Sequence, residues 1–256
     1  MASFLSRVAL ALLAGVSSTS LAAAAEIAVE AGDGAAERLT EALITAKPGD
    51  TVRIGAGRFD LTDGLSLDVD DVVVKGAGPG QTILSFKAQS GAGEGLLVTS
   101  DRVVLEDFAV EDSKGDGVKS KGSDPITFRN LRVEWTNGPD EKNGAYGVYP
   151  VASKNILIEK VLVKGAADAG IYVGQSENIV VRESRAEYNV AGIEIENSMK
   201  ADVYKSVATH NTGGILIFDL PNLPVQGGHD IRVFDNDVTD NDTANFAPKG
   251  NMVAIV

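Results

Sequence analysis

The chain has 256 residues, of which 44% are hydrophobic, 5% are aromatic and 28 are glycine, and it contains no cysteine. The lack of cysteine excludes disulfides, thiol catalysis and thiolate metal sites. The formal net charge of −13 argues against nucleic acid as a partner. It also argues against binding of a polyanion, unless a cation or a local basic patch bridges the two.

Residues 1–25 are predicted to be a secretory signal peptide. Arg7 provides the positive charge, Val8–Val16 form a short apolar stretch, and the letters SLAAAAE contain a small-residue cleavage site before Glu26. The apolar stretch is too short to span a bilayer, so we expect no membrane insertion. The mature protein, residues 26–256, is therefore expected to be periplasmic or secreted.

A single helix is predicted over about residues 37–46, ahead of the rest of the chain. The dipeptide Pro48-Gly49 ends it. Four apolar residues lie on one face of this helix: Leu39, Ala42, Leu43 and Ala46. Such a face predicts a helix that covers the first coil of a repeated structure.

The rest of the chain is an internal repeat. Its units begin at Gly64, Gly95, Gly117, Gly147, Gly170, Gly192 and Gly214, with successive spacings of 31, 22, 30, 23, 22 and 22 residues. Repetition at such a period is typical of a solenoid. In residues 170–191, alternating apolar residues form three short strands separated by turn residues, which predicts three strands per coil of about 22 residues.

Corresponding positions of the units are expected to stack in columns. One inner column is Val118, Val148, Ile171, Ile193 and Ile215. A second is Phe128, Ile158, Val181, Val203 and Val233. A turn column is Asn189, Asn211 and Asn241, which predicts an internal asparagine ladder, because asparagine tolerates left-handed backbone and can bridge coils through its amide.

The stretch LTEALITAKPGDTVRIGAGRF resembles the N-terminal capping helix and first strand of right-handed parallel β-helix proteins of the pectin-lyase-like superfamily. With the repeats, the resemblance covers residues 30–256. It implies an all-β, right-handed parallel β-helix with a short capping helix. The superfamily includes polysaccharide lyases, hydrolases, mannuronan epimerases and non-enzymatic repeat proteins.

The catalytic motifs of these enzymes are missing from the sequence. The nearest string to the Asp-Pro-His-Asp of mannuronan epimerases is GGHD at residues 227–230, and the Asn-Thr-Asp and Gly-His-Gly elements of polygalacturonases are absent. No catalytic set is therefore carried over from the resemblance. The similarity is to exported bacterial β-helix repeat proteins.

The candidate site lies on the outer side of the first strand of each unit, because residues that alternate with an inner column must point outward. One outer column is Lys119, Tyr149, Tyr172, Glu194 and Leu216. The other is Lys121, Val151, Gly174, Glu196 and Phe218. Tyrosine beside glycine makes a platform for a sugar ring, and the superfamily enzymes act on this face.

Two kinds of chemistry fit these residues. A uronate lyase or C5-epimerase must neutralise a carboxylate and remove a proton; Lys119 or a bound Ca²⁺ can do the first, and Tyr149 or Tyr172 the second. Glu194 and Glu196 can instead form a carboxylate pair for glycoside hydrolysis. We assign Lys119, Tyr149, Tyr172 and Glu194 as catalytic candidates. Lys121, Glu196 and Phe218 are substrate-binding candidates.

Two histidines complete the candidates. His210 belongs to a column at the end of the third strand, with Trp135, Tyr188 and Asp240, where an aspartate could orient a general base, so His210 is a fifth catalytic candidate. His229 lies near the end of the loop 218–230, and Asp219 and His229 are taken as substrate-binding candidates. Inserted loops at 136–146, 218–230 and 242–250 are expected to flank the face. The string DNDVTDND lacks the glycine and distal glutamate of an EF-hand loop, so no metal site is predicted.

Two functions remain open at this point. The first is an exported protein that binds a polysaccharide along the outer face of the first strands and acts on it. The second is a non-catalytic scaffold or binding module of the cell envelope. The sequence ends on the apolar string NMVAIV, so we expect further sequence or another chain to cap the C-terminal coil.

Overall fold

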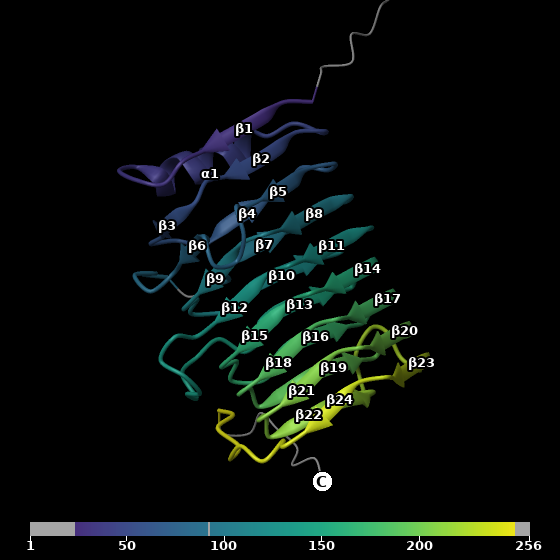
Figure 1. The fold of residues 1–256 in the computed structure, drawn as a ribbon. Helices are drawn as coiled ribbons and strands as arrows, with labels where there is room; N and C mark the ends of the chain where they lie inside the picture. The colour runs from purple at the N-terminus through teal and green to yellow at the C-terminus, as the bar shows by residue number, and fades with distance from the viewer. Residues whose placement is uncertain (1–23, 92, 249–256) are drawn as a thin grey trace, which may run out of the picture.

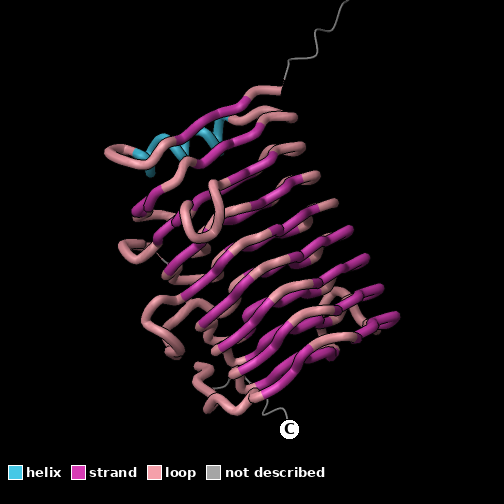
Figure 2. Tube along the Cα trace, viewed as in Figure 1, coloured by secondary structure: helices cyan, strands magenta, loops and turns pink. Residues whose placement is uncertain are grey.

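The computed structural model describes residues 24–91 and 93–248. This part of the chain winds into stacked coils, and each complete coil contributes one strand to each of three parallel sheets (Figure 1). Short turns join the strands, and one helix lies at the N-terminal end (Figure 2). The predicted all-β solenoid with three strands per coil is confirmed.

The first sheet has seven strands, in the order β4 (Leu65–Leu67), β7 (Leu96–Val98), β10 (Val118–Lys121), β13 (Val148–Val151), β16 (Ala169–Gly174), β19 (Ala191–Glu196) and β22 (Gly213–Phe218). The second has nine: β1 (Glu26–Val29), β2 (Thr51–Ile54), β5 (Val73–Lys75), β8 (Val103–Glu106), β11 (Ile126–Arg129), β14 (Lys154–Glu159), β17 (Glu177–Arg182), β20 (Met199–Tyr204) and β23 (His229–Phe234). The third has eight: β3 (Gly57–Asp60), β6 (Thr82–Ser85), β9 (Ala109–Glu111), β12 (Arg132–Glu134), β15 (Leu162–Lys164), β18 (Arg185–Glu187), β21 (Val207–Thr209) and β24 (Asp237–Thr239).

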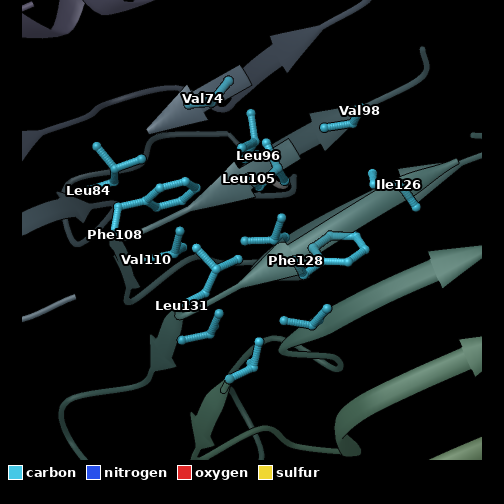
Figure 3. Close-up of a cluster of buried hydrophobic side chains, with 14 of the residues drawn as sticks. Val74, Leu84, Leu96, Val98, Leu105, Phe108, Val110, Ile126, Phe128 and Leu131 are labelled. Atoms are coloured by element: carbon cyan, nitrogen blue, oxygen red, sulfur yellow. The ribbon is translucent and has the colours of Figure 1, made fainter. Parts of the chain in front are cut away.

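The inner columns form the core between the three sheets. Strand pairing places Val118 beside Val148, and Ile171 beside Ile193, as expected for the first column. The second column is confirmed in the same way from Phe128 to Val233. Figure 3 shows part of this core, in which buried side chains of all three sheets point toward one another. Burial of these apolar columns is the main favourable term in folding.

The helix α1 (Ala35–Thr45) begins two residues before the predicted start and ends one residue before the predicted end. Its four predicted core residues are all buried: Leu39, Ala42, Leu43 and Ala46. The helix packs on β1, β2, β3 and β4, which are the first strands of the three sheets. It thus covers the N-terminal end of the core, as its apolar face predicted.

Polar ladders run along the turns. The asparagine ladder is confirmed: Asn211 accepts hydrogen bonds from the backbone and side-chain N–H groups of Asn189, at 2.9 and 3.0 Å, and donates to Asn241 at 2.9 Å. The sequence analysis did not predict a second ladder, in which Ser153 N–H donates to Ser176 and Ser176 N–H donates to Ser198. These side chains satisfy buried backbone donors that the sheets leave unpaired.

The signal peptide and the terminal string NMVAIV lie outside the described residues, apart from Ala24 and Ala25, so their assignments stay predictions. In the last described coil, Val233 and Val238 are both 45% exposed. Within 24–91 and 93–248, no helix has the length and apolar character needed to cross a membrane.

Replacing Asn211 by alanine should destabilise the protein by about 1–3 kcal/mol, because it leaves buried donors and acceptors of two neighbouring coils without partners. Chemical denaturation of the purified protein measures this change. Asn137, which is exposed and makes no side-chain hydrogen bond with any described residue, provides the matched control. Equal stability of Asn211→Ala and Asn137→Ala would show that the ladder does not stabilise the fold.

Candidate functional site

The two predicted outer columns are present on the outer face of the first sheet, which we call the first-sheet face. Lys119 pairs with Tyr149 across β10 and β13, and Tyr172 pairs with Glu194 across β16 and β19. In the second column, Gly174 pairs with Glu196. In-register pairing therefore brings residues about 22–30 positions apart in the sequence into contact on one face.

A third outer column was missed by the sequence analysis. It consists of the residues that directly precede the unit glycines, including Glu94, Asp116 and Tyr146. Both Glu94 and Asp116 form ion pairs with the Lys119 ammonium at 3.1 Å. The available signal was an acidic residue before the first three unit glycines, at Asp63, Glu94 and Asp116.

Three tyrosines form the tyrosine cluster in the middle of this face: Tyr146, Tyr149 and Tyr172. The ring of Tyr146 stacks on that of Tyr172, with centroids 4.4 Å apart, and contacts that of Tyr149 at 4.7 Å. The rings of Tyr149 and Tyr172 meet edge to face at 4.8 Å. Offset and edge-to-face pairs of this kind add to the free energy gained by burial alone.

The expected platform of Tyr172 beside Gly174 differs in the structure. A Cβ atom at Gly174 would lie 2.7 Å from a Tyr172 ring carbon, so the ring of Tyr172 occupies the space that the glycine leaves. Tyr172 is consequently only 5% exposed. Its neighbours Tyr146 and Tyr149 keep more exposure and form the accessible part of the cluster.

Lys119 lies at one side of the tyrosine cluster. Its ammonium lies 4.7 Å from the centroid of the Tyr149 ring, a cation–π contact. Burial alone would lower the pKa of Lys119, but the charges and hydrogen bonds of Asp116 and Glu94 outweigh burial and raise it. Lys119 is therefore a protonated side chain whose charge is already balanced by two carboxylates.

Three acidic residues form the acidic cluster at the other side: Asp168, Glu194 and Glu196. The Tyr172 hydroxyl donates a hydrogen bond to the Glu196 carboxylate. Burial raises the pKa of Glu194 to about 8, and the negative charges of Asp168 and Glu196 add to this. Burial also raises the pKa of Asp168 to about 6, although a hydrogen bond from Tyr146 opposes the shift.

The tyrosines are neutral hydrogen-bond donors at this site. Burial is the largest cause that raises the pKa of Tyr146, Tyr149 and Tyr172. The ammonium of Lys119 partly offsets the shift at Tyr149. The face thus combines phenols, a Glu194 carboxyl that holds its proton at neutral pH and a Glu196 carboxyl that accepts one hydrogen bond, which is a set suited to general acid–base catalysis.

A cavity of about 240 Å³ adjoins Lys119 on the N-terminal side. Its lining includes Asp63, Ser66, Gln89, Glu94 and Leu97. Ser66 and Leu97 continue the column of Lys119, since Ser66 pairs with Leu97 and Leu97 with Lys119. The cavity and the clusters therefore form one continuous strip along the first-sheet face.

The remaining binding candidates lie at the edges of this strip or away from it. Lys121 is exposed, and Phe218 is partly buried against the small apolar group formed by Ala169, Tyr172, Ala191 and Leu216. Asp219 accepts a hydrogen bond from Gly228 N–H at 2.8 Å, which closes the loop between β22 and β23. His229 begins β23 in the second sheet and contacts Asp230 at 2.9 Å, so it lies on another sheet.

His210 lies in the turn after β21, in left-handed backbone with φ of 54°. Its Nδ1 lies 3.0 Å from the Thr209 hydroxyl, and its ring lies 5.0 Å from that of Tyr188. Asp240 contributes its main-chain carbonyl, which accepts a hydrogen bond from His210 N–H. The Trp135 side chain does not join His210 and Tyr188 as expected, because its indole is buried and donates a hydrogen bond to the Ser113 carbonyl at 2.7 Å.

Two loops lie at opposite ends of the first-sheet strands (Figure 1). The loop 136–146 leads from β12 into β13 and ends with Tyr146, so it contributes directly to the tyrosine cluster. The loop 219–228 follows β22 and is anchored by Asn197. The side-chain amide of Asn197 donates hydrogen bonds to the carbonyls of Leu220 and Val225 and accepts one from Leu220 N–H. Of the loop 242–250, residues 242–248 are described.

Among the described residues, no group of three or more histidine, aspartate or glutamate side chains is arranged to hold a metal ion. Ca²⁺, which the sequence analysis considered as a bridge to a polyanion, therefore has no ligand set that can be named from the described residues.

Comparison with known proteins gives a family and a set of similar folds. Residues 72–229 match the sequence family described as the right handed beta helix region. An alginate lyase from Paenibacillus sp. str. FPU-7 is 20% identical, with a TM-score of 0.60, over 83% of this chain and 75% of the lyase. The mannuronan C-5 epimerase A-module of Azotobacter vinelandii is 15% identical, with a TM-score of 0.42, over 79% of this chain and 72% of the module.

No curated protein matches the chain in sequence. At 20% identity the alginate lyase structure is evidence for the fold alone. The family match spans more than half of the chain, and it agrees with the three parallel sheets and the stacked columns. This protein belongs to the right-handed parallel β-helix family, with the pectin-lyase-like fold.

Proposed function

We propose that this protein binds a polysaccharide along the first-sheet face and cleaves its glycosidic bonds by acid–base catalysis. The observation that carries the proposal is the pair Glu194 and Glu196, next to each other on one face of β19 but in different environments. Glu194 makes no hydrogen bond with a described residue, whereas Glu196 accepts one from Tyr172. Glycosidases need one protonated and one ionised carboxyl group.

In the proposed reaction Glu194 is the general acid and donates its proton to the glycosidic oxygen. Glu196 is the carboxylate that activates water or attacks the sugar, and Tyr172 orients it. Tyr146 and Tyr149 provide apolar ring faces against which a sugar can pack. The length of the strip, from the cavity beside Lys119 to Phe218, is suited to an extended chain of sugars.

A second candidate, a uronate lyase or C5-epimerase, is favoured by the contact between Lys119 and Tyr149. Lys119 would neutralise the uronate carboxylate, and Tyr149 would transfer the proton. This reaction requires Lys119 to exchange Glu94 and Asp116 for the substrate. Such an exchange leaves two carboxylates without their cation, and for this reason we place hydrolysis first.

The proposal includes export from the cytoplasm. It rests on residues 1–25, whose charge, apolar stretch and small-residue site are those of a secretory signal. Polysaccharides of the cell envelope are accessible to a protein in the periplasm or outside the cell. The solved alginate lyase with this fold is consistent with a polysaccharide ligand, at the level of analogy between folds.

Incubation with neutral, amino and uronate polysaccharides tests the proposed reaction. New reducing ends should form on one class of polymer, and Glu194→Gln and Glu196→Gln should each lower the rate at least about 100-fold, the usual contribution of a general acid or base. Glu183→Gln, an exposed carboxyl outside the first-sheet face, is the matched control.

The products separate the alternatives in that experiment. Unsaturated uronate, detected by its ultraviolet absorbance, or a changed anomeric NMR spectrum without cleavage would assign the lyase or epimerase. Binding of a polymer without any product would assign a non-catalytic module. Full activity of both glutamine variants would contradict the roles given to Glu194 and Glu196.

The acid role requires Glu194 to hold its proton at neutral pH. Its pKa is about 8 in the folded protein against an ordinary value of 4.5, so between these values the unfolded chain binds fewer protons. Stability should therefore fall as the pH rises through this window, by at most about 1.4 kcal/mol per pH unit from this residue.

Urea denaturation of the protein and of Glu194→Gln at a series of pH values measures this contribution. The variant should gain stability relative to the parent between about pH 4.5 and about pH 8, the interval between the two pKa values. Glu183→Gln should follow the parent throughout. A difference between parent and Glu194→Gln that does not change with pH would show that Glu194 ionises normally.

A further inference from the structure

The clusters and the cavity of the first-sheet face are acidic, and Lys121, in the second outer column of this face, is exposed outside them. Among the described residues that form the clusters and line the cavity, Lys119 is the only basic side chain. The acidic side chains are Asp63, Glu94, Asp116, Asp168, Glu194 and Glu196. Like charges on adjacent strands repel one another, so the face selects against a ligand that adds more carboxylates.

Lys119 shows how this face holds an ammonium group. Two carboxylates, those of Glu94 and Asp116, each lie 3.1 Å from its Nζ, and the ring of Tyr149 lies beneath it at 4.7 Å from the centroid. Charge-assisted hydrogen bonds and a cation–π contact thus act together. These are the interactions by which a protein recognises a cationic ligand.

The other end of the clusters offers the same groups without a cation. The rings of Tyr146 and Tyr172 are stacked there, beside Asp168, Glu194 and Glu196. Asp168 faces Tyr146, and Glu196 is hydrogen-bonded by Tyr172. Rings and carboxyls of this kind surround Lys119 on β10, and they recur two and three strands away, at β16 and β19.

Glu194 is the observation that points to a ligand. It is 4% exposed and forms no hydrogen bond or ion pair with any described residue. Its carboxyl oxygens are not completely enclosed, so a ligand can reach them. A buried carboxyl without a partner is costly, and the charges of Asp168 and Glu196 increase the cost of ionising it. An ammonium group bound at this point would provide the missing hydrogen-bond partner and would reduce the repulsion between the negative charges. A uronate carboxylate would increase that repulsion.

We propose that the polysaccharide bound by this face carries free amino groups, and that one ammonium group of an amino sugar binds between Asp168 and Glu196 against the tyrosine cluster, where the protonated Glu194 carboxyl accepts one of its hydrogen bonds through the carbonyl oxygen. This inference rests on the proposed function and specifies its substrate class. Neighbouring sugars extend along the strip toward the cavity, where Asp63 and Glu94 are in position to accept hydrogen bonds from further amino or hydroxyl groups.

Isothermal titration calorimetry with matched oligosaccharides tests the proposal. The probes are a β-1,4-linked glucosamine oligomer, the same oligomer with every amine acetylated, and an oligomannuronate of equal length, at a pH below the pKa of the sugar amine. The glucosamine oligomer should bind at least about tenfold more tightly than either other probe, and its affinity should fall as salt is added.

Proton release from Asp168 gives a second readout that a structural role of this residue would not change. The Asp168 carboxyl is partly protonated in the free protein at about pH 6, and an ammonium ligand beside it should displace its proton, whereas Glu194 keeps the proton that its role as general acid requires. Titration in buffers of different ionisation enthalpy should therefore detect protons released on binding of the glucosamine oligomer. Asp168→Asn should lower the affinity for this probe at least about tenfold and abolish this release, while Glu183→Gln should leave both unchanged.

The outcomes are distinguishable. Tighter binding of the oligomannuronate, or equal binding of the amino and acetylated oligomers, would overturn the amino-sugar inference and leave the proposed polysaccharide-binding face in place. Binding of none of the probes or of any polymer tested would remove both. If Asp168→Asn does not fold, as judged by its circular dichroism and thermal unfolding, Glu196→Gln serves as the variant and should weaken binding of the glucosamine oligomer.

Discussion

In-register hydrogen bonding between each strand and its counterpart one coil away is the interaction on which the rest of this structure depends. A slip of one residue would move every inner side chain to the surface, since the side-chain period of a strand is two. The buried apolar columns oppose such a slip, and the ladders through Asn189, Asn211 and Asn241 and through Ser153, Ser176 and Ser198 oppose it at the turns. The register is therefore specified twice, by burial and by directional hydrogen bonds.

The same register assembles the candidate site. Lys119, Tyr149, Tyr172 and Glu194 occupy one position in four successive coils, so stacking places them side by side without any special loop. Close spacing of the strands then removes water from between them, which raises the pKa of Glu194 and of the tyrosines. The candidate site is thus a consequence of the repeat, because a position that repeats in sequence becomes a column in space.

The second sheet shows how this protein treats a column of charges that only stabilises. Glu106, Arg129, Glu159 and Arg182 alternate in sign, and each arginine contacts its acidic neighbours. On the first-sheet face, by contrast, Asp168, Glu194 and Glu196 are close together without a basic partner among the described residues. Strain of this electrostatic kind is common at functional sites, and the contrast between the two sheets supports placing function on the first.

The sequence by itself determined the coil length, the three strands per coil, the helix at the N-terminal end, the inner columns and the outward positions of Lys119, Tyr149, Tyr172, Glu194 and Glu196, because each depends on periodicity, which is local. Only the tertiary structure decided which of these groups meet and in what state. Tyr146 and Asp116, which directly precede unit glycines, belong to the site. The Trp135 side chain is buried in the core, and His229 lies on the second sheet. The pairing of Lys119, the enclosure of Tyr172 and the unpartnered carboxyl of Glu194 arise from contacts between coils, and contacts between coils set the burial and the charges that periodicity alone does not reveal.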